Sequence, residues 1–287
     1  MAQRFLVATD FSTRSDRALR RASLLARQVS AELILVHVVD DDRPKRLIQA
    51  ERLEAEALLA ELAATLREAD GIVCDSRVVF GAAFQALSDA ADDTGADLLV
   101  IGPHRRQMLR DTFLGTTAER TIRASGKPVL MANSVPAGPY RTVVLATDFS
   151  PASVAAAQAA KQLGLLGSAA VVALHMLDLP EEGPVLRATM AVTEYETFLA
   201  QAEQRAHAKL ERYGRETGIA AVAQVLSPAE EPTGMAVNGF AKSVNAGLVV
   251  AGTHGRTGLE KWLLGSVAES ILSHAEMDVL AVPPSNA

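Results

Sequence analysis

Hydrophobic and polar positions along this chain follow two recurring patterns, short apolar runs and longer amphipathic segments. Near-continuous apolar runs are typical of parallel strands buried on both faces, and in the first half they predict strands at 5–9, 33–39, 73–80, 98–101 and 129–132. Apolar residues spaced three and four apart predict the intervening helices, at about 12–29, 45–69, 82–93 and 116–124. Strands that alternate with helices predict an α/β fold with a doubly wound parallel sheet.

The second half of the chain repeats the first. The hexapeptide VATDFS at 7–12 returns as LATDFS at 145–150, and Gly102 and Gly115 correspond to Gly252 and Gly265. The repeat predicts two tandem Rossmann-like domains, each a five-stranded parallel sheet with helices on both faces. We expect copy 1 at 1–135 and copy 2 at 140–287, with a linker at 133–140 that contains two prolines and a glycine. Extra residues of copy 2 are expected in its second helix (184–217) and in the loop 227–234.

Composition narrows the classes of partner. The chain has 28 Lys and Arg against 34 Asp and Glu, for a net charge of −6, which argues against nucleic-acid binding. No apolar run approaches the ~20 residues of a membrane span, and the N-terminus does not look like a secretory leader. We therefore expect a cytoplasmic protein with no membrane partner. The single Cys74 excludes an intramolecular disulfide and is expected to be a buried, inert thiol.

The loops after the first and fourth strands are the candidate ligand site. In open parallel sheets, ligands bind beyond the carboxyl ends of the strands, where the strand order reverses. The fourth strand of copy 2 ends in a loop with Gly252, Gly255 and Gly265, and Gly265-Ser266 opens a helix. Glycines allow a backbone to approach a ligand closely, and a helix N-terminus can cradle a phosphate. The alternative is that these glycines serve only tight turns. The loop is neither a Walker A loop nor the dinucleotide fingerprint.

The spacing G-x2-G-x9-G-[ST], with an aspartate at the end of the first strand, resembles the universal stress protein family over essentially the whole chain, once per copy. Copy 2 matches throughout, with Asp148, Gly252, Gly255, Gly265 and Ser266. Copy 1 keeps a partial set and has Arg105 where the second glycine belongs; the residues that it keeps are Asp10, Gly102, Gly115 and Thr116. We therefore expect the better-formed nucleotide site in copy 2.

The resemblance also implies a ligand and an assembly. In this family the early aspartate and the backbone after the strand-2 histidine approach adenine, which suggests Met176 in copy 2 and Val38 in copy 1. The glycine loop would hold the ribose and phosphates of ATP, with Mg²⁺ as an optional companion. One-domain members pair through their fifth strands, so the copies are expected to form an internal pseudo-dimer through 129–132 and 279–282. Whether two chains form a homodimer is left open.

Several residues near these loops also have a purely structural interpretation. Asp10 and Asp148 can turn or cap the backbone, and His37 and His175 are expected to be hydrogen-bonded core histidines. A cluster of arginines could reach phosphates or form a solvated basic loop; its members are Arg105, Arg106 and Arg110. His104 and His254 have no Cys or carboxylate at ligand spacing, so we expect no metal site.

Three functional hypotheses remain. The first is a regulatory protein of the stress response that binds ATP or a related adenine nucleotide. The second is a slow ATP hydrolase or adenylyltransferase, which is less favoured because the sequence shows no nucleophile–base pair and no carboxylate cluster near the loop. The third is a protein-interaction module with vestigial sites, which the loss of a loop glycine favours for copy 1 only.

Overall fold

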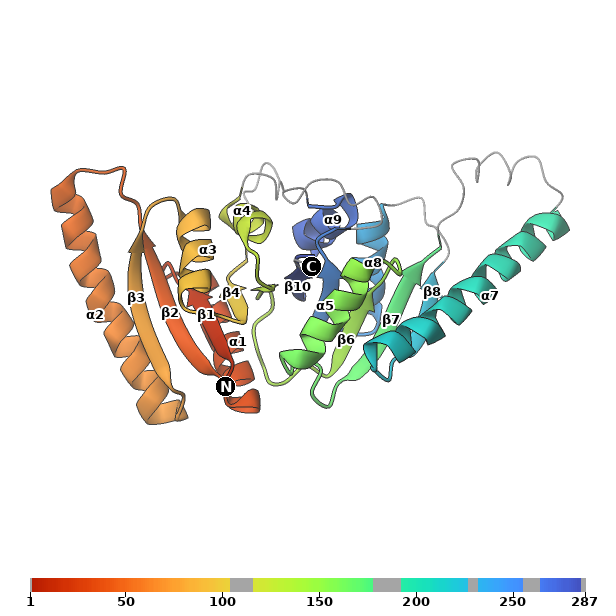
Figure 1. Cartoon of the computed structure of the whole chain (residues 1–287), viewed down its shortest axis with the longest axis horizontal. Coiled ribbons are helices and arrows are strands. Elements are labelled where there is room, and N and C mark those ends of the chain that lie inside the picture. Colours follow the sequence, from red (N-terminus) through yellow and green to blue (C-terminus); the bar gives the residue numbers. More distant parts are fainter. Residues whose placement is uncertain (1, 104–115, 178–191, 227–231, 255–263, 285–287) are drawn as a thin grey trace.

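The computed structural model describes residues 2–103, 116–177, 192–226, 232–254 and 264–284 (Figure 1). Copy 1 contains, in order, β1 (Arg4–Ala8), α1 (Thr13–Val29), β2 (Glu32–Val39), α2 (Lys45–Asp70), β3 (Cys74–Phe80), α3 (Ala83–Asp93), β4 (Leu98–Ile101), α4 (Thr117–Ala124) and β5 (Val129–Met131). Copy 2 contains β6 (Thr142–Ala146), α5 (Pro151–Gln162), β7 (Ala170–Met176), α7 (Val192–Thr217), β8 (Val222–Leu226), α8 (Thr233–Ser243), β9 (Leu248–Gly252), α9 (Ser266–His274) and β10 (Asp278–Val282).

The strands of both copies form one ten-stranded sheet in the order β3-β2-β1-β4-β5-β10-β9-β6-β7-β8. Neighbouring strands within each copy are parallel, which confirms the predicted fold class. The strand order reverses between β1 and β4 and between β6 and β9. The loops that follow these four strands therefore flank the reversal, as the sequence predicts.

The two copies meet through their fifth strands. β5 and β10 pair antiparallel, with Leu130 opposite Leu280 and Val129 opposite Ala281. The expected contact between these strands is thus present. It closes the edge that each five-stranded sheet would otherwise expose, and it places the copies side by side in Figure 1.

Helices cover both faces of the sheet, and the cores beneath them run through both copies. One core packs under α1, α2, α5 and α7 and includes Leu130 and Leu280. The other packs under α3, α4, α8 and α9 and includes Met131 and Val279. Apolar burial is the dominant stabilising contribution in folding, so each copy depends on its neighbour for part of its core.

Within the described residues, the predicted element boundaries agree with the structure to within a residue or two. The second helix of copy 2 is predicted over 184–217, and its described part is α7, Val192–Thr217. Residues 184–191 and most of the expected extra loop, 227–231, lie outside the described residues. Within the described part of the chain, no helix is long and apolar enough to cross a membrane.

The predicted linker packs against the junction between the two copies. The carboxylate of Asp278, at the start of β10, is fully buried and accepts hydrogen bonds at 2.8 Å from Arg21 Nε and Tyr140 Oη. Its other oxygen accepts from Ser134 N and Oγ at 2.9 and 2.8 Å. Arg21 belongs to copy 1, and Ser134 and Tyr140 belong to the linker. The network therefore joins all three parts of the chain.

Candidate functional site

The candidate site of copy 2 begins at the turn between β6 and α5. Asp148 Oδ1 accepts a hydrogen bond from Ser150 N at 3.0 Å, and Phe149 adopts a left-handed backbone conformation with φ 66°. Ser150 then caps α5 by accepting from Ser153 N at 3.2 Å, with Pro151 at the first helical position. The structural role considered for Asp148 is therefore present, because its carboxylate holds this turn.

His175, at the end of β7, fixes the neighbouring wall of the site. Its Nδ1 lies 2.8 Å from the Thr147 carbonyl oxygen, and its ring lies 4.2 Å from the ring of Phe149. His175 is buried, as expected of a hydrogen-bonded core histidine. It also lines the cavity described next, which the sequence reasoning did not anticipate.

A cavity of about 310 Å³ opens beyond the carboxyl ends of β6, β7 and β9. Its size falls within the range of small-ligand sites. Five of the predicted residues line it together: Asp148, Met176, Gly252, Gly265 and Ser266. The lining that the sequence did not single out includes Thr147, Thr233, Val237 and Val267. Gly255 lies outside the described residues.

The N-terminus of α9 forms one wall of the cavity. Gly265 occupies the N-cap position and offers no side-chain cap, while its own N–H donates to Thr253 O at 2.7 Å. The first intrahelical bond is donated by Glu269 to Gly265 O. The N–H groups of the three intervening residues have no intrahelical acceptor, and all three residues line the cavity: Ser266, Val267 and Ala268. Such a helix start attracts anions and suits a phosphate.

Gly252 packs closely against α5, a feature that the sequence did not reveal. A Cβ at this position would lie 3.1 Å from the backbone C and O of Ala152, in the first turn of α5. Gly102 is in the same situation in copy 1, where a Cβ would lie 2.8 Å from Arg14 O. The first glycine of each loop therefore lets a strand end approach a helix closely, with or without a ligand.

Copy 1 forms the same turn, but the contacts of its aspartate differ. Asp10 Oδ1 accepts from Ser12 N at 3.0 Å, as Asp148 does from Ser150. However, Asp10 Oδ2 also lies 3.4 Å from Arg14 Nη2, and copy 2 has Ala152 at the equivalent position. Burial raises the pKa of Asp10, but hydrogen bonds from Ser12 and Ser15 and the charge of Arg14 outweigh it and lower the pKa overall. In copy 1, Arg14 thus contacts Asp10, whereas in copy 2 the equivalent Asp148 lines the cavity.

The helix that follows the loop also differs between the copies. Thr116 is the N-cap of α4, and its hydroxyl accepts from Glu119 N at 3.1 Å. This bond satisfies one of the N–H groups that a phosphate would need. In copy 2, the helix starts one position earlier relative to the repeat, and its N-cap residue, Gly265, has no side chain to accept such a bond. This difference leaves one N–H group fewer for an anion at the helix start of copy 1.

The remaining candidates of copy 1 lie at the end of β2. His37 Nδ1 lies 2.8 Å from Thr9 O, and its ring stacks on Phe11 with 4.6 Å between centroids. Val38 follows it and is half-buried in the second core. The expectation of a core histidine is met here as well. Five loop positions lie outside the described residues: His104, Arg105, Arg106, Arg110 and Gly115.

The described part of the chain contains no group of three or more His, Cys, Asp or Glu that could hold a metal ion. Among the described residues at the cavity, His254 Nδ1 lies 3.0 Å from Thr253 Oγ1. Thr253 is buried and does not line the cavity, whereas His254 does. This hydroxyl is therefore badly placed to attack a ligand.

Comparison with known proteins assigns both copies to one family. The model of the universal stress protein family matches residues 1–133 and again 139–283. A universal stress protein of Mycobacterium tuberculosis is 26% identical over 296 residues, which cover 98% of this chain and 97% of the relative. One from Methanocaldococcus jannaschii is 34% identical over 151 residues, covering 50% of this chain and 82% of the relative. The crystal structure of a universal stress protein from Archaeoglobus fulgidus shares the fold, with a TM-score of 0.70 at 19% identity, over 99% of this chain and 97% of that one.

Proposed function

The chain belongs to the universal stress protein family, and on this premise we propose that copy 2 binds ATP or a related adenine nucleotide in a regulatory role in the stress response. One observation carries the proposal. The uncapped N-terminus of α9 and the carboxylate of Asp148 line the same cavity, from opposite sides of the strand-order reversal. An anion-binding group and a carboxylate thus face one cavity.

We assign the two ends of the cavity to the two ends of the nucleotide. The N–H groups at the start of α9, with the Ser266 hydroxyl, are suited to phosphate oxygens. Asp148 and the backbone at Met176 are suited to the amino group and ring nitrogens of adenine. His175 and Phe149 hold this wall in place through the contacts described above. Any Mg²⁺ would be carried by the phosphates.

The proposal is for binding without efficient turnover. Catalysis of phosphoryl transfer needs positioned charges around the transferred group, usually including metal-holding carboxylates. Among the described residues that line the cavity, Asp148 is the one carboxylate, and it already holds the β6–α5 turn. Copy 1 is proposed to bind nucleotide more weakly or not at all, since Arg14 and Thr116 engage its equivalent groups. We propose that the two domains span 1–135 and 140–287.

Isothermal titration of ATP into the full-length protein tests this function. The whole chain must be used because the halves share both cores. Asp148→Ala should reduce affinity at least about tenfold, equivalent to ~1.4 kcal/mol. Asp10→Ala is its matched control, because it removes the same turn hydrogen bond in copy 1, and it should leave ATP affinity unchanged. Equal effects of the two substitutions would assign the aspartates a structural role only.

A second pair of variants tests the phosphate end. Ser266→Ala should weaken ATP about two- to tenfold, the loss expected for one hydrogen bond of ~0.5–1.5 kcal/mol. Gly265→Val should weaken it further, because a branched side chain would intrude at the helix start. Thr116→Ala removes the α4 cap of copy 1 and should leave ATP affinity unchanged. If Gly265→Val stays folded and binds ATP like the parent, the phosphate assignment is wrong. If the parent binds no adenine nucleotide, an interaction module with vestigial sites becomes the better function.

A further inference from the structure

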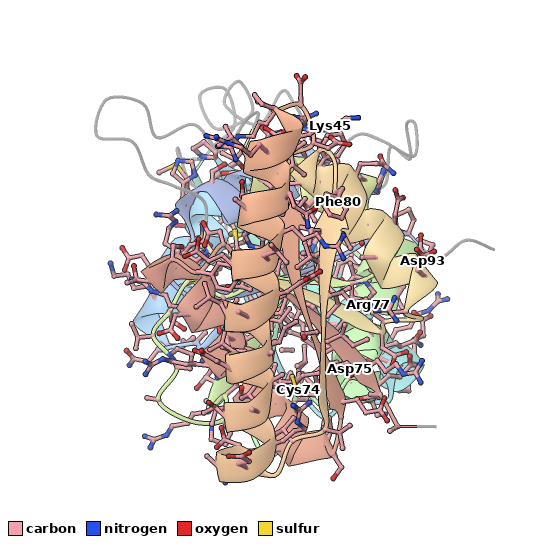
Figure 2. All side chains as sticks on the ribbon, turned by 90° about the vertical axis from the view of Figure 1, so that its left-hand side faces the viewer. Lys45, Cys74, Asp75, Arg77, Phe80 and Asp93 are labelled. Atoms are coloured by element: carbon pink, nitrogen blue, oxygen red, sulfur yellow. The ribbon has the colours of Figure 1, made fainter. Side chains whose placement is uncertain are left out.

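The strand β3 forms one end of the ten-stranded sheet and leaves one edge unpaired by the described residues. Figure 2 views this end of the molecule, with β3 running beside α2 and with Asp75 and Arg77 on the side away from that helix. An exposed sheet edge is a template for pairing with another strand. The partner that this edge fits can be worked out from its register and its charges.

Backbone hydrogen bonds establish which groups of β3 point outward. Leu33 N donates to Val73 O at 2.8 Å, and Gly81 N donates to Val39 O at 3.1 Å. Odd-numbered residues of this strand therefore direct their N–H and C=O groups toward β2. Because these directions alternate along a strand, the even-numbered residues direct theirs outward: Cys74, Ser76, Val78 and Phe80.

The side chains of this edge are charged at its centre and apolar at its ends. Asp75 and Arg77 are both exposed, and neither forms an ion pair with another described residue. Val73 is 65% exposed and Phe80 43% exposed. Asp75 and Arg77 stand two residues apart and therefore point to the same face of the sheet. An edge with opposite charges at this spacing is complementary to a reversed copy of itself.

We propose that β3 pairs antiparallel with β3 of a second copy of this chain, about a twofold axis at Ser76. In this register Ser76 and the Ser76 of the second copy exchange two backbone hydrogen bonds. Cys74 forms the next hydrogen-bonded pair, with the Val78 of the second copy. Asp75 then lies directly opposite the Arg77 of the second copy, and the reverse pair forms with it. These are non-hydrogen-bonded pairs, whose side chains approach most closely. Val73 faces Val79 in the same way.

Neighbouring registers are less favourable. A twofold axis at Arg77 would place two arginines opposite each other, and one at Asp75 would do the same with two aspartates; both arrangements are repulsive. If one strand shifted by a single residue, even-numbered residues would lie opposite odd-numbered ones, whose backbone N–H and C=O groups point toward β2 and cannot pair. Only the axis at Ser76 joins two opposite-charge pairs while using the outward groups. The same axis sets α2 beside its copy, and α2 exposes three leucines that are available to this second contact: Leu47, Leu53 and Leu58.

The opposite end of the sheet provides a matched comparison. β8 is the equivalent edge of copy 2, where Val222 and Gln224 occupy the places of Asp75 and Arg77. It lacks the charge pair and is not expected to associate. The competing explanation for Asp75 and Arg77 is that charges on an edge strand guard it against pairing of any kind. The two explanations predict opposite states in solution.

Sedimentation velocity of the full-length chain over a concentration series tests the proposal. The parent should form a dimer of twice the chain mass of 30.3 kDa. Arg77→Asp opposes like charges twice and should weaken the dimer at least tenfold. The exchanged variant Asp75→Arg/Arg77→Asp restores both pairs and should dimerise again. Gln224→Asp is the control at the other edge and should behave like the parent.

Ser76→Pro gives a test that is independent of charge. It removes an outward N–H while leaving the bonds to β2 intact, so it should also yield monomers with a normal thermal transition and unchanged ATP binding. A parent that stays monomeric at every concentration would overturn the proposal and favour the guarding role. A dimer that survives both Arg77→Asp and Ser76→Pro, or an exchanged variant that stays monomeric, would also overturn it.

Discussion

Replacing Asp278 by alanine is the most informative perturbation of the junction between the copies. The substitution removes a carboxylate that is fully buried and accepts four hydrogen bonds, one of them from the Arg21 guanidinium at 2.8 Å. Arg21 is itself only 4% exposed. It keeps its bond to Gly138 O and its position over the Tyr140 ring, 4.2 Å from the centroid, but it loses its counter-charge.

The magnitude follows from the burial of both partners. Breaking a buried ion pair by removing one partner costs about 3–5 kcal/mol, because the other charge stays in a low-dielectric environment. We expect Asp278→Ala to lower the free energy of unfolding by this amount, which is a factor of about 10²–10⁴ in the folding equilibrium. Arg21→Met/Asp278→Ala should be more stable than Asp278→Ala alone, because no unpaired charge remains.

Urea denaturation followed by circular dichroism gives the required free energies. The control is Asp16→Ala, which removes the exposed Arg20–Asp16 pair on the same helix as Arg21, at the same 2.8 Å separation. An exposed pair contributes about 0–1 kcal/mol, so this variant should remain close to the parent. The reasoning is refuted if Asp278→Ala costs no more than Asp16→Ala, or if adding Arg21→Met destabilises it further.

Three other predictions concern pH, packing and capping. Burial raises the pKa of Cys74 from its ordinary 9.0 to about 11 and raises that of Tyr140 well above its ordinary value, with Asp278 adding to the latter shift and Arg21 opposing it. The unfolded chain then loses protons that the folded chain retains, so the urea midpoint should fall as pH rises above about 9, and a flat profile up to pH ~11 would contradict this. Gly102→Ala should cost about 1–3 kcal/mol, since its Cβ would lie 2.8 Å from Arg14 O, whereas Gly126→Ala, with open space around it, should be nearly neutral in the same assay. Ser150→Ala should lower stability by about 0.5–2 kcal/mol through loss of the α5 cap, and an unchanged thermal midpoint would count against that cap.

The fold was largely readable from the sequence because the repeat and the apolar runs are strong local signals. The repeated hexapeptides VATDFS and LATDFS identify equivalent turns of the two copies. The long apolar runs indicate strands that are buried on both faces of the sheet. The candidate site was readable in outline, since the residues that line the cavity of copy 2 follow strand ends that meet at the reversal. These signals are local in sequence, and the parts that were missed are not.

The missed features depend on contacts between distant segments. Nothing in the sequence near Gly252 indicates that it packs closely against the backbone of Ala152, one hundred residues earlier in the chain. Similarly, the composition of 133–140 indicates only a linker, and only the fold brings Ser134 and Tyr140 to the Asp278 carboxylate.

The junction has one consequence for how this chain recognises itself. In the repeat, the position of Asp278 corresponds to Pro128 of copy 1, and the position of Arg21 corresponds to Ala159 of copy 2. The buried ion pair therefore occurs once and has no equivalent on the other side of the junction. Two copy-2 halves joined in the same way would bury each aspartate against alanine, and two copy-1 halves would bury each arginine near proline. In either arrangement a charge would be buried without its counter-charge, so the buried ion pair favours the pairing of copy 1 with copy 2. Because the two halves are joined in one chain, neither has to be complementary to a copy of itself, and the junction can be asymmetric.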